Sequence, residues 1–309
     1  MAQKYIGVDI AKNWIDIFFP ETGEHRRIDT TSAKLRCFVK ETKGHVVVFE
    51  ASGGYERPLM DILDTFSTDF SRVNPRQARN FARATGLLAK TDKVDARMLA
   101  RMGKALELKP SRLKEKARDR LTDLVSRRDD LVNCIGRERN RRAQARDGWI
   151  KRQINSLLVV LNSHLKKIEK EINSHITTND KLKDDCERLQ SIPGVGPVLS
   201  STLVSSLPEL GKLDRRKIAA LAGLAPHACD SGLFKGKRKI WGGRSNVRRT
   251  LYLAAFIASR HDPKFKEFRD RLQKSGKPVK VAITACARKL LTILNAMVRD
   301  KTTYKIGHI

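Results

Sequence analysis

The chain has 309 residues, which is room for about two domains with buried cores and excludes a small disulfide-stapled protein. Its 63 lysines and arginines outnumber its 34 acidic residues and give a formal net charge of +29. Because 40% of the residues are apolar, the chain can fold as a globular protein whose surface carries this charge. The phosphate backbones of DNA and RNA are the partners that such a charge favours.

The cysteines and the apolar segments indicate the compartment. The five cysteines are widely spaced without a CxxC pair, which argues against structural zinc and is typical of a reducing compartment. The N-terminus lacks the apolar stretch of a signal peptide, and no window approaches a membrane span. We therefore expect a cytoplasmic protein that does not enter a membrane.

Residues 1–110 alternate between strand-like and helix-like segments. The expected strands are residues 4–10, 14–19, 46–49 and 70–73, and the expected helices are residues 55–66 and 75–84. This alternation predicts an α/β layer domain with a mixed sheet.

Residues 111–190 contain no proline and are predicted to be helical. Apolar residues recur there at heptad-like spacing, which indicates an antiparallel hairpin or coiled coil: Ile150, Ile154, Leu157, Leu161, Ile168 and Ile172. Residues 137–152 carry seven basic and two acidic residues. This run is either a solvated helix face or a contact for nucleic acid, with RNA as our first choice.

Residues 191–309 are predicted to form a mainly helical domain. Helices are expected over residues 215–222, 251–259 and 279–298, and a Gly/Pro-rich loop over residues 223–243. Gly194 and Gly196, in the sequence IPGVGPV, either let backbone amides approach a phosphate, as in a helix-hairpin-helix motif, or form a turn between packed helices. Both interpretations are open.

Four acids are candidates for a metal site. Asp9 lies inside the first expected strand, Glu50 directly follows an apolar strand, and Asp92 and Asp95 are three residues apart and so share a helix face. Four carboxylates from two strands and a helix offer the hard oxygen ligands that two Mg²⁺ ions require for phosphoryl transfer. Any one of these acids, taken singly, is more often a cap or a surface charge. That simpler role is expected for three acids with less apolar neighbours: Asp16, Asp29 and Asp61.

Ser231 lies in the triplet Asp230-Ser231-Gly232, which is in the first place a turn signature. Trp241 and seven basic residues follow it closely: Lys235, Lys237, Arg238, Lys239, Arg244, Arg248 and Arg249. Amid this charge Ser231 is either a nucleophile towards a phosphodiester held by the cations, or a turn residue only. A role for the nearby His227 is open.

Several motifs together carry a family resemblance. In chain order they are GVDIAK, FEASGGYE, KTDKVDARMLA, IPGVGPVLSSTL, LAGLAP, DSG and KGKRKIWGGRSNVRRTLYLAA. This ordered set resembles the DEDD transposases of bacterial insertion sequences, the IS110 family with its IS1111 branch, which also includes the Piv-type DNA invertases. The likeness spans nearly the whole chain.

The resemblance implies a RuvC-like, ribonuclease-H-type domain over residues 1–110, a coiled coil over residues 111–190 and a C-terminal transposase domain over residues 191–309. It implies that Asp9, Glu50, Asp92 and Asp95 bind Mg²⁺, and that Ser231 forms a covalent phosphoserine link to DNA. A structured bridge RNA that pairs with donor and target DNA, a tetramer with composite active sites and a location at the bacterial nucleoid are implied as well. The alternatives are a metal-dependent junction nuclease or invertase without an RNA guide, and a non-catalytic nucleic-acid-binding protein.

Overall fold

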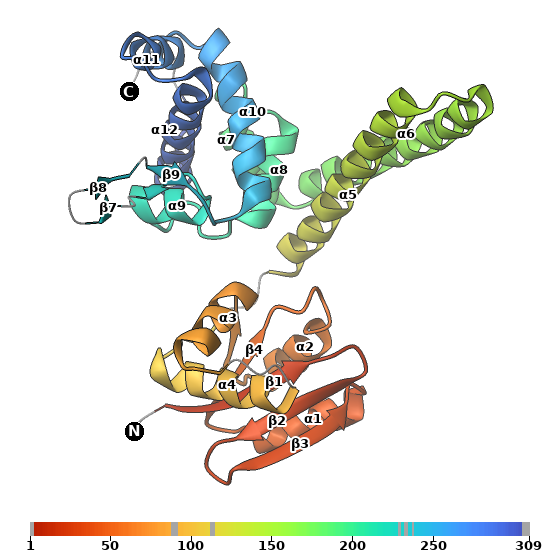
Figure 1. Cartoon of the computed structure of the whole chain (residues 1–309), viewed down its shortest axis with the longest axis vertical. Helices are drawn as coiled ribbons and strands as arrows, with labels where there is room; N and C mark the ends of the chain where they lie inside the picture. Colours follow the sequence, from red (N-terminus) through yellow and green to blue (C-terminus); the bar gives the residue numbers. More distant parts are fainter. Residues whose placement is uncertain are drawn as a thin grey trace. The chain divides into compact units, whose positions relative to one another are not determined.

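A computed structural model describes residues 3–87, 92–111, 115–227, 230–231, 234–236 and 238–304, without the side chains of residues 92, 93, 230, 231, 234 and 235. The chain forms two compact units, residues 1–113 and 114–309 (Figure 1). Each unit has its own hydrophobic core. The predicted helical middle and the predicted C-terminal domain both fall within the second unit.

Within the described residues, a five-stranded sheet with the order β3-β2-β1-β4-β5 forms the centre of the first unit. Its strands are β1 (Lys4–Ile10), β2 (Trp14–Phe19), β3 (Glu24–Asp29), β4 (His45–Glu50) and β5 (Phe70–Val73). β1, β2 and β3 are antiparallel neighbours, whereas β4 and β5 continue parallel to β1. The predicted α/β class with a mixed sheet is therefore confirmed.

Helices cover both faces of this sheet because its central strands are apolar on both sides (Figure 1). They are α1 (Ser32–Glu41), α2 (Arg57–Thr65), α3 (Pro75–Ala84) and α4 (Asp92–Ala105). On one face Val8 and Phe49 pack with α1 and α2. On the other face Tyr5 and Val48 pack with α3 and α4.

The sequence pattern predicts neither β3 nor α1. β3 has the polar sequence EHRRID without an apolar alternation, and it lies at an edge of the sheet with most of its residues exposed. α1 is largely polar and buries only Leu35, Phe38 and Val39. Both elements depend on packing against their neighbours, which a local apolar period does not reveal.

The second unit is mainly helical. Its helices are α5 (Lys116–Gln144), α6 (Gly148–Thr177), α7 (Asp180–Gln190), α8 (Pro197–Ser206), α9 (Arg215–Leu221), α10 (Ser245–His261), α11 (Pro263–Lys274) and α12 (Val279–Asp300). α5 and α6 form the predicted antiparallel hairpin. Its seam is closed at the base, where Ile172 is 6% exposed, and open at the far end, where Leu157 is 45% exposed.

α12 is the central helix of the C-terminal core. Leu290, Leu291 and Leu294 are fully buried in it. This helix is long enough to cross a membrane, and its most apolar 18 residues have a mean hydropathy of 1.5. Half of that stretch is buried inside the protein. The expectation that no window of the sequence approaches a membrane span is therefore wrong. Burial in the core accounts for the apolar composition of α12.

Candidate active site

Asp9 on β1 and Glu50 on β4 lie beside each other at the same end of the sheet. The two strands are parallel with Val8 opposite Phe49, so the next residues, Asp9 and Glu50, are opposite each other too. Val8 and Phe49 are fully buried against α1 and α2. Because side chains alternate along a strand, Asp9 and Glu50 belong to the other face, which α4 covers, and both are partly exposed.

The packing of α4 brings Asp95 to this same end. A Cβ on Gly7 would lie 1.9 Å from a carbonyl oxygen in the first half of α4, whereas a Cβ on Gly103, near the end of the helix, would lie 2.7 Å from the ring of Tyr5. α4 therefore runs antiparallel to β1. Its first turn, which includes Asp95, points towards the end of β1 where Asp9 lies.

The backbone thus places three of the four predicted metal ligands at the same end of the sheet, and the fourth, Asp92, is the first residue of α4. The side chain of Asp92 lies outside the described atoms. Carboxylate oxygens are the hard donors that Mg²⁺ prefers, so the donor set fits this ion in kind. Among the described side chains, no three His, Cys, Asp or Glu residues are close enough to hold a metal ion. The four-acid site stays a prediction.

Asp16 lies on the opposite side of Asp9 from Glu50, as the register partner of Asp9 on β2. It is only 5% exposed, and Arg27 of β3 donates to both of its carboxylate oxygens at 2.8 to 3.2 Å. The guanidinium of Arg27 also lies over the ring of Trp14 at 5.0 Å. The expectation that Asp16 is an ordinary cap or surface charge is wrong: it is a buried carboxylate in an ion pair next to a candidate metal ligand.

Glu56 organises the loop that follows Glu50. Its buried carboxylate accepts hydrogen bonds from the backbone amides of Ser52 and Gly54 at 3.2 and 2.8 Å and pairs with Arg72 at 2.7 Å. Burial alone raises the pKa of Glu56, but the backbone amides of Glu56 itself and of Gly54, together with Arg72 and the Ser52 hydroxyl, outweigh burial and hold the pKa below its usual value. The charged form of Glu56 therefore fixes the backbone directly after Glu50.

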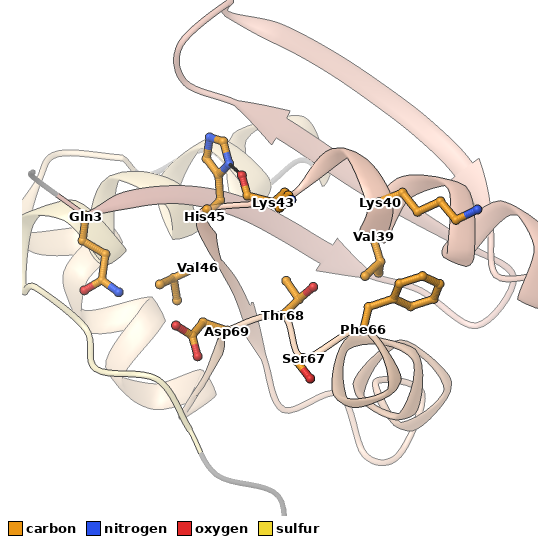
Figure 2. A pocket seen from close by; sticks show the side chains of 11 residues that line it. Gln3, Val39, Lys40, Lys43, His45, Val46, Phe66, Ser67, Thr68 and Asp69 are labelled. Atoms are coloured by element: carbon orange, nitrogen blue, oxygen red, sulfur yellow. Dashed lines mark hydrogen bonds between the residues drawn. The ribbon is translucent and has the colours of Figure 1, made fainter.

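A hollow of about 440 Å³ opens at the opposite end of β4 from Glu50 (Figure 2). His45, the first residue of β4, lies at this end, with its Nδ1 atom 3.2 Å from the carbonyl oxygen of Lys43. Ser67 and Asp69 line the hollow across from His45. The hollow is thus separate from the predicted acid site.

Ser231 lies in a two-part β-ribbon between α9 and α10. β6 (Pro226–His227) pairs with β9 (Lys239–Ile240), and β7 (Asp230–Ser231) pairs with β8 (Phe234–Lys235) nearer the tip. The segment predicted as a loop is therefore a hairpin. The side chain of Ser231 lies outside the described atoms, so its role stays a prediction.

Arg248 and three glycines fix the base of this ribbon. The Arg248 guanidinium donates to the carbonyl oxygens of Gly242 at 2.6 Å and Gly223 at 3.3 Å. Gly223 and Gly243 have φ angles of +69° and +63°, and a Cβ on Gly243 would lie 2.2 Å from the Gly223 nitrogen. The two ends of the ribbon thus cross in backbone contact, which only glycine permits.

Three of the predicted phosphate-binding residues have internal partners. Arg244 makes a two-fold ion pair with Glu209, with distances of 2.6 and 2.8 Å. Arg249 pairs with Asp129 of α5 at 3.2 Å. Together with Arg248, these arginines connect elements of the second unit.

The remaining cations of the predicted set lie on the ribbon itself. Arg238 and Lys239 are exposed. Lys237 and the side chain of Lys235 lie outside the described atoms. Arg238 and Lys239 are therefore the described cations of this set that are best placed to meet a phosphate.

Gly194 and Gly196 have different surroundings in the turn between α7 and α8. Gly194 has a φ of +90°, and a Cβ there would lie 2.9 Å from the Ala258 nitrogen of α10, so this glycine serves close packing. Gly196 is the exposed N-cap residue of α8, with open space around its Cβ position. The turn does join packed helices, and a phosphate contact stays a prediction, with Gly196 as the more accessible position.

Comparisons with known proteins agree with the resemblance. A DEDD transposase model of the IS110 type matches residues 6–147, and a model described as the transposase IS116/IS110/IS902 family matches residues 186–270. The chain is 29% identical to the pilin gene-inverting protein of Moraxella bovis, with 98% of each chain covered. It is 24% identical to the transposase for insertion sequence element IS1111A of Coxiella burnetii, with 98% of this chain and 92% of the relative covered.

The four acids lie inside the first matched segment, and Ser231 and its basic neighbours lie inside the second. The order of the motifs along the chain is thus matched by the order of the two family models. The chain belongs to the IS110-type family of transposases.

Proposed function

We propose that this chain cuts and rejoins DNA with the four acids of its first unit and Ser231 of its second. The observation that carries the proposal is the parallel register that puts Asp9 beside Glu50, at the end of the sheet towards which the first turn of α4 points. Carboxylates at one end of a sheet offer the oxygen donors that a divalent cation prefers. The mixed sheet with helices on both faces supports a RuvC-like assignment.

Ser231 is the proposed nucleophile. Its Oγ atom forms a bond to the phosphorus of a phosphodiester, and the bond from phosphorus to one deoxyribose oxygen breaks. The serine proton leaves to solvent, and the departing oxygen takes up a proton. Arg238 and Lys239 on the same ribbon hold the phosphate oxygens. Mg²⁺ bound by the four acids would stabilise the charge that develops on those oxygens.

A guide RNA is part of the proposal and rests on the resemblance and on charge. Residues 137–152 form the far end of the α5–α6 hairpin, and all seven basic residues of the run are exposed there. Arg141 pairs with Glu138, and Arg142 donates to the side chain of Asn155. A projecting cationic tip of this kind can follow a phosphate backbone. Because donor and target are chromosomal DNA, a place at the nucleoid in the cytoplasm is proposed too.

Self-association is proposed from the open end of the same hairpin. Leu157, Val159 and Val160 on α6 are 45%, 71% and 50% exposed. The facing end of α5, residues 136–144, offers little apolar surface beyond Ala143. A second copy of the chain can cover these side chains, which supports a dimer or tetramer.

Inversion of a DNA segment is the second candidate. It is favoured by the likeness to the pilin gene-inverting protein over 98% of both chains. Inversion and transposition share cleavage and rejoining of strands, and they differ in the arrangement of the recombining sites. An alternative without Ser231 chemistry is a metal-dependent nuclease that hydrolyses DNA.

An adduct assay tests the proposal. The purified chain is incubated with Mg²⁺, labelled DNA that carries the junction of the element and RNA from its flank, and a denaturing gel is run for a protein–DNA adduct. We expect an adduct that Ser231→Ala and Asp9→Asn each abolish, whereas the exposed control changes Ser275→Ala and Asp29→Asn leave it intact. Cleavage without an adduct supports the nuclease, and binding alone rejects catalysis. Omitting the RNA tests guidance.

A further test addresses the composite site. Asp9→Asn and Ser231→Ala protein are mixed, and the adduct is measured as before. Its return shows that acids and serine from different copies act together, and its absence, while each variant still binds DNA, rejects the composite site.

A further inference from the structure

The base of the ribbon presents two aromatic rings on one face. His227 and Lys239 are register partners of β6 and β9, so their side chains share a face of the ribbon. The rings of His227 and Trp241 are in contact, with centroids 5.1 Å apart and planes inclined at 50°. Trp241 is nevertheless 67% exposed, and His227 is exposed as well. The pair is thus an open aromatic surface rather than part of the core.

The backbone beside Trp241 is held in place. Gly242 follows it directly, and the carbonyl oxygen of Gly242 accepts the 2.6 Å hydrogen bond from Arg248. Gly243 comes next and lies in backbone contact with Gly223. A large, exposed aromatic residue on a fixed backbone loses little conformational freedom when a ligand stacks on it.

Two exposed cations directly precede this surface in the chain and suggest its ligand. Arg238 and Lys239 are exposed on the strand that leads to Trp241. An aromatic ring flanked by cations suits a chain of alternating flat bases and phosphates. Such stacking needs an exposed base face, which an unpaired strand has and the interior of a duplex lacks.

We propose that Trp241 and His227 form a stacking platform for an unpaired nucleobase of the DNA strand that Ser231 attacks. The inference rests on the proposed function for its location: Ser231 is four positions after His227, so their Cα atoms are at most about 14 Å apart. A base held on the platform therefore lies within a few nucleotides of the attacked phosphate. Arg238 and Lys239 contact the phosphates of the same strand.

Binding of short oligonucleotides to the full chain tests the platform. The probes are an oligothymidylate, an abasic deoxyribose-phosphate oligomer of the same length and an oligouridylate. Binding is measured by quenching of tryptophan fluorescence and by the anisotropy of a label on the probe. Trp241→Ala should weaken oligothymidylate binding by about five- to 150-fold, the loss of one stacked base, and should leave binding of the abasic oligomer unchanged. Trp241→Phe should recover much of the loss. The matched control is Trp149→Ala, which removes a 61% exposed tryptophan from α6.

Each outcome has a distinct meaning. If Trp241→Ala weakens binding of the oligothymidylate and of the abasic oligomer equally, Trp241 serves phosphate binding or general stability. If it weakens neither, Trp241 is not part of the binding surface. Either result overturns the platform. If Trp241→Ala weakens oligouridylate binding more than oligothymidylate binding, the platform binds RNA and the assignment to DNA is overturned. Because these are binding measurements, they stay separate from the adduct assay: selective base binding without any Ser231 adduct would keep the platform and reject the proposed chemistry.

Discussion

Replacing Gly7 with alanine tests the packing of α4 on the sheet. The added methyl group would lie 1.9 Å from the Ala96 carbonyl oxygen and 2.5 Å from the Ala100 nitrogen, both in the α4 backbone. To restore the 3.4 Å of an ordinary contact, the helix must retreat from β1 by about 1.5 Å. Overpacking a core usually costs about 1–3 kcal/mol, and we expect about 3 kcal/mol here because backbone rather than a side-chain end must move.

Two other glycines provide a graded comparison. In Gly103→Ala the new methyl group meets the ring of Tyr5 at 2.7 Å and a methyl group of Val48 at 2.9 Å, which are side chains and not backbone. We expect a loss of about 1–2 kcal/mol. Gly136→Ala in α5 meets nothing within 4 Å and should stabilise its helix by up to about 1 kcal/mol, because alanine favours helical backbone.

Urea unfolding measures this series. Trp14 is in the first unit, so its fluorescence in a background with Trp149→Phe and Trp241→Phe reports on Gly7→Ala and Gly103→Ala. Gly136→Ala lies in the second unit, and its unfolding is followed by the loss of helical circular dichroism. The Gly7→Ala chain should also form less adduct per folded molecule, because α4 carries Asp95 away from Asp9. A Gly7→Ala chain as stable as Gly103→Ala would refute the close packing of α4 on β1. Normal adduct formation would refute the link from this packing to the chemistry.

Three contacts of charged groups give further predictions. Arg27→Ala should cost about 3 kcal/mol because it leaves the buried Asp16 without its ion pair, and adding Asp16→Asn should restore part of the loss in thermal denaturation. Glu56→Gln should lower the free energy of unfolding by about 2 kcal/mol at neutral pH. That difference should fade in urea titrations as the pH falls below 4.5, the usual pKa of a glutamate. The pKa of Glu56 in the folded protein is lower than this value, so the stabilising charged form is lost as the pH falls through that lower pKa. Arg244→Lys should cost about 1 kcal/mol in urea unfolding, since an ammonium group cannot reproduce the two-fold pair with Glu209.

Much of the first unit could be predicted because its central strands have a strong apolar signal. β1, β2, β4 and β5 agree with the expected strands to within a residue. β3 could not be predicted, because an edge strand needs no apolar residues of its own. Missing β3 also meant missing the partner of Asp16: the burial of this acid makes sense only when Arg27 lies on the neighbouring strand.

The basic cluster after Ser231 shows a second limit of sequence reasoning. Local sequence indicates a uniform group of cations, but their partners are distant in the chain. Glu209 lies 35 residues before Arg244, and Asp129 belongs to a different helix, α5. Charge density near a candidate nucleophile predicts that a phosphate can be held there. It does not show which cations are already engaged in holding the fold.

The acids and the serine belong to different compact units of the chain, so the proposed chemistry draws its groups from both. The acids lie at the end of a sheet where α4 packs tightly on β1. The serine ribbon is clamped at its base by Arg248. Neither unit contains the whole set of predicted groups, so the proposed reaction needs the acids of one unit and the serine of the other at the same phosphate. In the proposed composite site the acids and the serine come from different copies, so adduct formation should require assembly, and the mixture of Asp9→Asn and Ser231→Ala protein tests this requirement.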